Sequence, residues 1–234
     1  MTENPENLLM FSKAMMQQEA GLPILGMYNF TTLKDDVVAE PERALIVDIG
    51  GGRGQALIAI AKETENAWGT GAKMILQDRP PVLDSVPQDS IPGVEKMAYD
   101  FYDEQPIKSR FAQLPLLSSL TPLLIFMLDA HIYYYRRIMH NYQDNVCQPI
   151  LKNAVAAMGP TSRLLIGDLV IPAKTEVGED MSPYWMDMVM IAIGGKERSE
   201  KEFAALFDSV GLELVRVYLD DSTHQAVIEG RLKR

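Results

Sequence analysis

The stretch Leu45–Gln55, LIVDIGGGRGQ, decides the fold, because four glycines follow directly on an apolar run. The run Ala44–Ile49 is apolar on both faces apart from Asp48, as expected of a strand in the middle of a parallel sheet. The glycines keep side chains out of the turn, so that a ligand or a neighbouring backbone can come close. This stretch therefore predicts a buried strand that ends at a binding loop.

The residues after the glycines complete a strand–helix–strand unit. Residues 55–65, QALIAIAKETE, are helical in pattern, and Lys73–Asp78 is a second apolar strand that ends in an acid. Such a unit predicts a parallel sheet with right-handed crossovers. Further strands are expected to end at Asp100, to begin at His131, and to span 162–172, 213–219 and 224–232, the last two antiparallel. Helices are expected from Pro5, over 145–158 and over 200–211.

Composition excludes several classes of protein. The 234 residues are 47% hydrophobic and 23% charged, which is typical of a globular protein. A net charge of -10 disfavours a nucleic-acid partner, because binding phosphates requires clustered Lys and Arg. One cysteine, Cys147, indicates a reducing, cytoplasmic location, and three scattered histidines give no metal-ligand spacing. The polar N-terminus is not a signal peptide, and no membrane partner is expected.

The glycine loop fits one nucleotide-binding pattern and not another. The pattern G-x-G-x-x-G fails, since Gln55 or Leu57 stands at its third position. The pattern Asp-x-Gly-x-Gly-x-Gly fits from Asp48 through Gly50, Gly52 and Gly54. A nucleoside without phosphates needs close backbone approach and a nearby acid, whereas a pyrophosphate uses the N-terminus of the following helix. A glycine turn that serves only tight packing is the alternative.

Three acids at expected strand ends favour a cationic ligand. Asp48, Asp78 and Asp100 would repel a phosphate but would not repel a sulfonium cation. Asp78, at the end of the second strand, has the acceptor oxygens to bind both hydroxyls of a ribose. The loop and the acids together therefore favour a nucleoside that carries a positive charge.

With these residues placed, the chain resembles the S-adenosylmethionine-dependent O-methyltransferases of the plant and fungal small-molecule type, the caffeate and sterigmatocystin enzymes. The resemblance runs from about Pro5 to the C-terminus. It is carried, in order, by LIVDIGGGRGQ, LQDRP, PGVEKMAYDFYDEQP, YYYRRIMHNYQDN, LLIGDLVIP and GGKERSEKEF. It implies an α/β, Rossmann-like methyltransferase fold, with a mostly parallel seven-stranded sheet, an antiparallel C-terminal strand and helices on both faces.

The resemblance also implies S-adenosylmethionine as the cofactor and assigns residues to it. Gly50, Gly52 and Gly54 would lie beneath its methionine part, and Asp78 would hold the ribose. Asp100 and Phe101 would flank the adenine, and Arg136 would be a basic residue near the cofactor. Tyr142 would give an aromatic surface, and Asp48 is the acid of the first strand.

Transfer of a methyl group to oxygen requires alignment and an oxyanion. A phenol has a pKa of about 10, so a positioned base is useful at neutral pH, and histidine is well suited to this role. The resemblance implies His140 as this general base, with Asp168 and Glu197 orienting it. Asp168 stands where the family more often has Glu, and it is one methylene shorter. This route needs no metal ion.

The resemblance implies a pocket for a small hydroxylated acceptor. In the motif that is usually His-Asp-Trp, this chain has His140-Asn141-Tyr142, so that Asn141 replaces an acid that positions the substrate. The segment 181–195 would line the pocket. Its candidate residues are Met186, Asp187 and Met190.

Two departures from the family shape the expected domains. Residues 1–40 would be a connecting helix and linker, the remnant of an N-terminal dimerisation region, so that a homodimer is weakened. Residues 41–234 would be the S-adenosylmethionine-binding catalytic domain. Within it, the run 111–130, FAQLPLLSSLTPLLIFMLDA, interrupts the family pattern. We interpret this run as an insertion. One origin for such an insertion is intron sequence that has been translated.

Two other functions stay open at this point. The first is a catalytically inactive, cofactor-binding homologue that acts as the partner of a full-length enzyme. The second is a nicotinamide-dependent reductase, which the glycine spacing and the lack of an obvious Tyr-x-x-x-Lys pair disfavour.

Overall fold

A computed structural model of the chain describes residues 22–108, 129–174, 177–220 and 222–233. The strands are β1 (Ala44–Ile49), β2 (Met74–Asp78), β3 (Val94–Ala98), β4 (Ala130–Arg136), β5 (Arg163–Leu169), β6 (Leu212–Leu219) and β7 (Gln225–Leu232). The α-helices are α2 (Lys34–Ala39), α3 (Gln55–Trp68), α4 (Pro80–Asp84), α5 (Asp144–Val155), α6 (Ser182–Ala192) and α7 (Glu200–Asp208). Short 3-10 helices are η1 (Phe30–Leu33), η2 (Gln88–Ser90) and η3 (Met139–Asn141). The expected helix from Pro5 lies outside the described residues.

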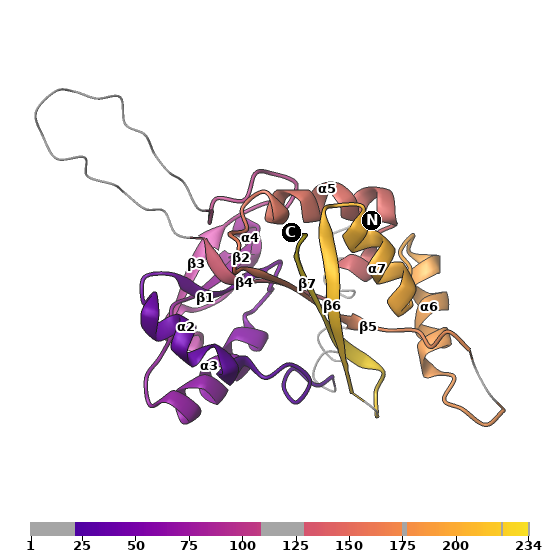
Figure 1. Ribbon diagram of the computed structural model, residues 1–234, viewed down its shortest axis with the longest axis horizontal. Coiled ribbons are helices and arrows are strands. Elements are labelled where there is room, and N and C mark those ends of the chain that lie inside the picture. Colours follow the sequence, from indigo (N-terminus) through magenta and orange to yellow (C-terminus); the bar gives the residue numbers. More distant parts are fainter. Residues whose placement is uncertain (1–21, 109–128, 175–176, 221, 234) are drawn as a thin grey trace, which may run out of the picture.

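The strands form one seven-stranded sheet in the order β3-β2-β1-β4-β5-β7-β6 (Figure 1). Neighbouring strands from β3 to β5 pair in parallel, while β7 is antiparallel to both β5 and β6. The expected mostly parallel sheet with an antiparallel C-terminal strand is therefore confirmed. The chain order reverses between β1 and β4, which is the place where open α/β sheets bind ligands.

Alternate residues of β4 point to opposite faces of the sheet, and each face has its own core. Tyr133 and Tyr135 pack in one cluster with the buried side of α5 and α7. Ile132 and Tyr134 pack in the other cluster with α3 and η1. Because both faces are covered by helices, β4 is buried along almost its whole length, which explains its apolar and aromatic sequence.

The glycine turn closes β1 against β2. The amides of Gly50 and Gly51 both donate to the carbonyl oxygen of Gln77, at 2.8 and 3.2 Å. A Cβ atom at Gly51 would lie 2.4 Å from Oδ2 of Asp48, a contact that no side chain could make. The glycine at this position is therefore required by packing, and the turn lies at the carboxyl end of the sheet.

The amino ends of β1, β4 and β5 are held together by a buried ion pair. Nη2 of Arg43 donates to Oδ2 of Asp129 at 2.8 Å and to Oγ of Ser162 at 3.0 Å. Asp129 and Ala130 close the run 111–130 that was expected to be an insertion, and Ala130 begins β4. The rest of that run, up to residue 128, lies outside the described residues.

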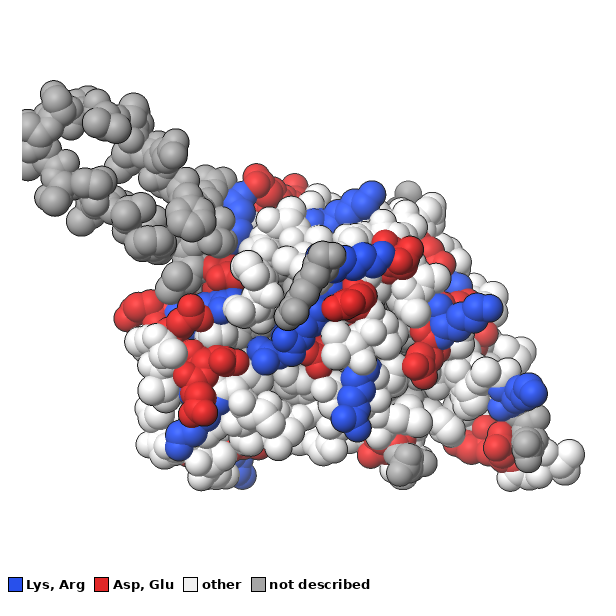
Figure 2. Space-filling view, in the orientation of Figure 1, with Lys and Arg blue, Asp and Glu red and all other residues white. Residues whose placement is uncertain are grey.

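Charged side chains of both signs are interspersed on one face of the molecule (Figure 2). On the face shown in Figure 2, Lys and Arg lie among Asp and Glu. Across the described ranges, no helix has the length and apolar character needed to cross a membrane. The same ranges contain no group of three or more His, Cys, Asp or Glu side chains placed to hold a metal ion.

Candidate active site

His140 lies in η3, directly after β4, and is 3% exposed. Its Nδ1 atom is 3.0 Å from Oε1 of Glu197, which is equally buried. Because a carboxylate only accepts hydrogen bonds, we assign the proton to Nδ1. The opposite ring nitrogen, Nε2, has no hydrogen-bond partner among the described residues. The imidazole is thus fixed at one nitrogen and available at the other.

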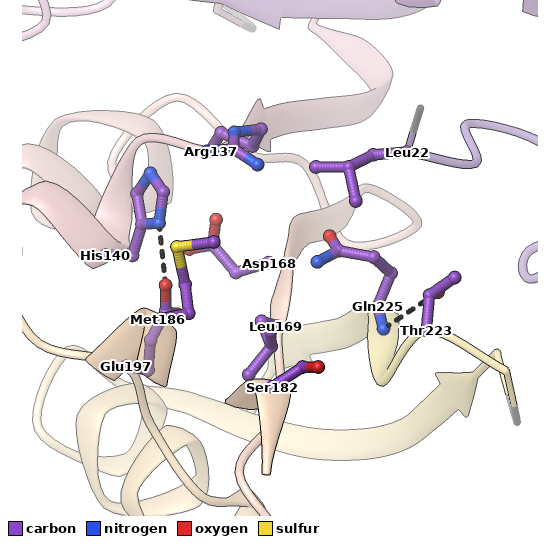
Figure 3. A pocket seen from close by; sticks show the side chains of 10 residues that line it. All are labelled: Leu22, Arg137, His140, Asp168, Leu169, Ser182, Met186, Glu197, Thr223 and Gln225. Carbon is purple, nitrogen blue, oxygen red and sulfur yellow. Dashed lines mark hydrogen bonds and ion pairs between the residues drawn. The ribbon is translucent and has the colours of Figure 1, made fainter. Parts of the chain in front are cut away.

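A cavity of about 120 Å³ lies beside His140 (Figure 3). Its walls come from η3, the end of β5, the start of α6, the loop before α7, the start of β7 and the chain before η1. The lining residues are Leu22, Arg137, His140, Asp168, Leu169, Ser182, Met186, Glu197, Thr223 and Gln225. The cavity therefore joins ionisable groups on one side to apolar and neutral polar groups on the other.

Asp168, next to last in β5, is 1% exposed. Neither of its carboxylate oxygens has a hydrogen-bond partner in the described part of the chain. Burial raises the pKa of this carboxyl to about 6, against the lowering effects of His140 and of the arginines nearby. Asp168 thus changes its protonation state close to neutral pH.

The pKa of His140 is raised above its usual value. Burial acts to lower this pKa, but the negative charge of Asp168 and the hydrogen bond to Glu197 outweigh burial. Arg137 opposes the two carboxylates. The site therefore stabilises the imidazolium, the form that a histidine base takes after it has accepted a proton.

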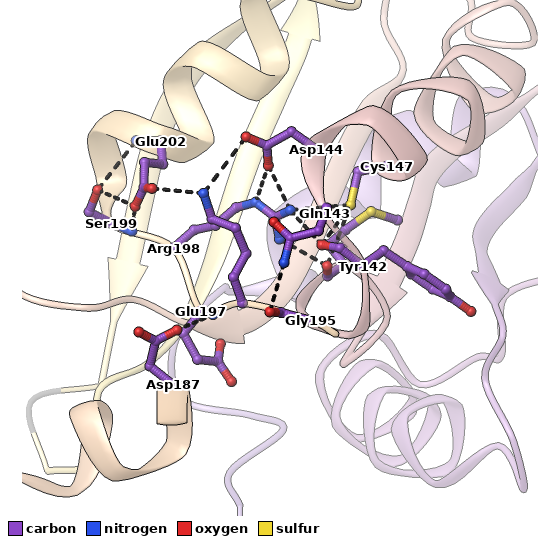
Figure 4. A network of polar contacts seen from close by, with 12 residues as sticks. Tyr142, Gln143, Asp144, Cys147, Asp187, Gly195, Glu197, Arg198, Ser199 and Glu202 are labelled. Atoms are coloured by element: carbon purple, nitrogen blue, oxygen red, sulfur yellow. Dashed lines mark hydrogen bonds and ion pairs between the residues drawn. The ribbon is translucent and has the colours of Figure 1, made fainter. Parts of the chain in front are cut away.

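A buried arginine holds the segment that carries His140 (Figure 4). Nη1 of Arg198 donates to the carbonyl oxygen of Met139 at 2.9 Å, and Nη2 donates to that of Tyr142 at 2.7 Å. Its Nε and Nη2 atoms also bind Oδ1 of Asp144, at 2.9 and 2.7 Å. One guanidinium group thus fixes the backbone on both sides of His140.

The loop that carries Glu197 is tied to the same segment. The amide of Lys196 donates to the carbonyl oxygen of His140 at 2.9 Å. A Cβ atom at Gly195 would lie 2.2 Å from that oxygen, so glycine is needed for this approach. From α6, Oδ1 of Asp187 accepts the amide of Glu197 at 2.9 Å. These contacts set the distance between base and carboxylate.

On the other side of the sheet's switch point, the glycine loop meets Asp78. The amide of Gly52 donates to Oδ2 of Asp78 at 2.9 Å, and the amide of Arg79 donates to Oδ1 at 2.7 Å. Each oxygen keeps further acceptor capacity. A Cβ atom at Gly52 would meet no described atom within 4 Å, so there is open space above the loop.

Aromatic residues border this loop. The ring of Phe101 lies 6.2 Å from that of Tyr142, in an edge-to-face arrangement, and a Cβ atom at Gly50 would lie 3.9 Å from Phe101. Asp100 is exposed, and its Oδ1 accepts the amide of Tyr102 in a turn. This turn ends β3 at Ala98, two residues before the expected end.

The structure brings some of the predicted residues together and leaves others apart. Of the catalytic and substrate candidates, His140, Asp168, Glu197 and Met186 line the cavity. Asn141 instead donates to the carbonyl oxygen of Arg137 at 2.9 Å, and Asp187 holds the Glu197 amide. Met190 is buried in α6, and Nη2 of Arg136 is 3.5 Å from the carbonyl oxygen of Leu22.

The sequence interpretation missed the cavity residues Arg137, Thr223 and Gln225. Arg137 belongs to the Arg136-Arg137 pair of the sequence. Its backbone φ is 55°, a left-handed conformation that no pattern in the sequence predicts. Thr223 lies in the turn before β7 and Gln225 is the first residue of β7, both about 80 residues after His140 in the chain. Only the tertiary fold brings them to the same cavity.

Comparisons with known proteins point to one family. The sequence model of the family described as "O-methyltransferase domain" matches residues 126–213. The chain is 49% identical, over its full length, to 53% of O-methyltransferase hmp5 of Hypomyces subiculosus. It is 33% identical over 189 residues to demethylsterigmatocystin 6-O-methyltransferase stcP of Emericella nidulans, covering 80% of this chain and 79% of the relative.

A solved structure gives the same result. The crystal structure of OxaC in complex with SAH and oxaline superposes with a TM-score of 0.78, at 33% identity, over 99% of this chain and 52% of OxaC. The chain thus spans about half the length of most of the relatives that it matches.

Proposed function

Because the chain belongs to the O-methyltransferase family, we propose that it transfers a methyl group from S-adenosylmethionine to a hydroxyl group of a small secondary metabolite. One observation carries the proposal: His140 lines the cavity with Nδ1 held by Glu197, and its Nε2 has no hydrogen-bond partner among the described residues. That arrangement is suited to a general base. The names of the relatives and the SAH complex of OxaC support the reaction class and the cofactor.

The cofactor is proposed to lie over the glycine loop. Asp78 has remaining lone pairs for ribose hydroxyls, and the space above Gly52 allows close approach. Phe101 and Tyr142 offer aromatic surfaces beside it. When bound, S-adenosylmethionine supplies a methyl carbon whose bond to sulfur breaks as its bond to the acceptor oxygen forms, leaving S-adenosylhomocysteine.

His140 is proposed to remove the acceptor proton. The hydroxyl proton moves to Nε2 as the oxygen becomes nucleophilic, and Glu197 stabilises the resulting imidazolium through Nδ1. The proton is later released to solvent, which restores the neutral base. Asp168 adds a second negative charge near the ring.

The first experiment measures the cofactor separately from turnover. Calorimetric titration with S-adenosylhomocysteine should show binding that is lost in Asp78→Ala and kept in Asp89→Ala, an exposed aspartate in η2. A panel of phenols is then tested for methyl transfer. Binding without any transfer to the panel counts against the enzyme, and no binding by a folded chain counts against both parts of the proposal.

A second candidate function is a cofactor-binding homologue without turnover, acting with a full-length relative. The raised pKa of His140 favours it, since it lowers the fraction of neutral imidazole that can accept a proton at a given pH. The two functions differ in alkaline solution, where His140 becomes neutral. Methyl transfer that appears as the pH rises supports the enzyme, and inactivity at every pH supports the homologue.

A further inference from the structure

We infer that Asp168 binds the acceptor directly and selects acceptors that carry a second O–H or N–H donor near the hydroxyl that is methylated. This inference rests on the proposed function, because it names the acceptor class of that same cavity. It gives Asp168 a different role from that of orienting His140.

The hydrogen bonds of the site separate the two carboxylates. Glu197 binds Nδ1 of His140. The imidazole has only two nitrogens, so with Nε2 used for the acceptor, Glu197 already occupies the one nitrogen through which the ring can be oriented. Asp168 makes no hydrogen bond to the imidazole, and both of its oxygens are without a partner in the described ranges. It is 1% exposed and lines the cavity together with His140 (Figure 3). Asp168 therefore has unused acceptor capacity at the wall of the cavity.

The charge state of Asp168 determines which groups it can bind. Above its pKa of about 6, Asp168 is ionised and only accepts hydrogen bonds, so its partner must be a donor. A buried carboxylate without a partner is costly, and a donor on the acceptor molecule removes that cost on binding. An ether or carbonyl oxygen in the same place could not donate a hydrogen bond to the carboxylate. Its partial negative charge would also repel the charge of the carboxylate. Asp168 therefore discriminates between a hydroxyl and its methyl ether.

The size of the cavity limits the distance between the two donors. Its volume of about 120 Å³ is close to that of an apolar cavity known to hold one benzene molecule. His140 and Asp168 line this one space, so a single ring can reach both. The acceptor class is thus a ring with two donors, one for Nε2 and one for the carboxylate.

The test compares dihydroxybenzenes with their monomethyl ethers. The pairs are catechol with 2-methoxyphenol and resorcinol with 3-methoxyphenol, because each ether keeps one hydroxyl and loses the second donor. In the wild type, kcat/KM should favour the better diol over its ether by about tenfold or more, the effect of one buried hydrogen bond to a charged group. In Asp168→Asn, whose amide donates as well as accepts, the ratio should fall to about two, the number of equivalent hydroxyls.

A role in orienting His140 gives a different result. Loss of orientation lowers kcat for diol and ether alike and leaves their ratio unchanged. An unchanged ratio in Asp168→Asn, or a wild-type ratio near two, overturns the inference. The control is Gln225→Met, which removes a polar group from another wall of the cavity and should leave the ratio unaltered.

Binding measurements separate this inference from the proposed function. Calorimetry on the chain loaded with S-adenosylhomocysteine gives Kd values for the same pairs, and S-adenosylhomocysteine binding shows that each variant is folded. Selective diol binding without transfer supports the inference and removes the proposed function. Transfer without selectivity, or no diol binding at all, removes the inference. Should Asp168→Asn fail to fold, the wild-type ratios alone decide.

Discussion

Nδ1 of His140 and Oε1 of Glu197 lie 3.0 Å apart, and the two residues are 57 positions apart in the sequence. Both are almost fully buried, so little solvent screens the charge of one from the other. Other residues hold this pair in place. Arg198 and the amide of Lys196 bind the backbone of η3, and Asp187 binds the backbone amide of Glu197. The separation of His140 and Glu197 is thus set by hydrogen bonds to the backbone that carries each of them.

The first prediction concerns the charge of that pair. Glu197→Gln keeps an acceptor for Nδ1 but removes the charge that stabilises the imidazolium. We expect kcat to fall by about 10²- to 10⁴-fold, the range of a general-base contribution. S-adenosylhomocysteine binding should stay within about twofold, because Glu197 lies on the acceptor side. A variant with normal kcat would show that the pair does not serve proton transfer.

The second prediction is the pH dependence of the reaction. Only neutral imidazole accepts a proton, and the carboxylates raise the pKa of His140 above its usual value although burial opposes them. Activity should therefore increase with pH through a midpoint above about 6.5. In Glu197→Gln the midpoint should move to lower pH, because one source of the raised pKa is gone. Profiles of kcat/KM for an acceptor phenol measure both midpoints, and a flat profile from pH 6 to 9 contradicts the prediction.

The third prediction concerns the arginine that fixes η3. Arg198→Lys replaces a planar guanidinium, bound to two carbonyl oxygens and to Asp144, by a point charge that cannot reach all three. We expect the free energy of unfolding to fall by about 2–4 kcal/mol, since charged hydrogen bonds in a buried position are lost. The exposed Arg216→Lys serves as the control, with a change within about 0.5 kcal/mol. Urea unfolding of both variants gives the comparison.

The fourth prediction concerns His131, which lies at the amino end of β4, whereas His140 follows its carboxyl end, and which is 1% exposed. Burial, helped by the charge of Arg43, lowers its pKa, so the folded state prefers the neutral ring. The unfolded ring has a pKa of about 6.5, so this contribution to stability is complete above that value and is lost as the pH falls below it. We expect the Tm of His131→Gln to depend less on pH between 6.5 and 5 than the wild-type Tm.

Asp168 acts in the opposite sense in the same range. Its pKa is raised to about 6, so protonation on acidification stabilises the folded state. The wild-type curve alone therefore mixes two effects, and the difference between wild type and His131→Gln isolates one of them. Parallel curves would mean that His131 titrates alike in the folded and unfolded chain.

The sheet was predictable from the sequence for physical reasons. A strand buried on both faces must be apolar throughout, as Ala44–Ile49 is, and a glycine turn after it marks the carboxyl end. These two features define β1 and the loop, and the helical pattern and second apolar run that follow predict the parallel β2. The boundary at β3 was less predictable, because the turn at Asp100 depends on one side chain accepting the Tyr102 amide.

The cavity was only partly predictable. His140, Asp168 and Glu197 were implied by the resemblance to the O-methyltransferases, whose motifs the sequence carries in order, and all three line the cavity. Arg137 and Gln225 were not implied, because Arg137 depends on a positive φ and Gln225 on a strand that is distant in the sequence. The segment 181–195 was predicted to line the pocket, but as the helix α6 it turns only Ser182 and Met186 toward this cavity. Position on a helix decides which side chains line it.

The fifth prediction separates ligand approach from backbone strain at the glycine loop. Gly52 and Gly69 both have a positive φ, of 59° and 74°, and a Cβ atom at either position would meet no described atom within 4 Å. Alanine at either position should therefore cost about 1–2 kcal/mol through the left-handed backbone alone. Gly69 ends α3, away from the loop, whereas the amide of Gly52 binds Asp78.

The two variants should differ in cofactor binding. We expect Gly52→Ala to weaken S-adenosylhomocysteine binding by about tenfold or more, since its methyl group projects into the open space, and Gly69→Ala to leave binding unchanged. Urea unfolding and calorimetry on the same samples give both quantities. Equal affinity in the two variants would show that the space above Gly52 is not where the cofactor lies.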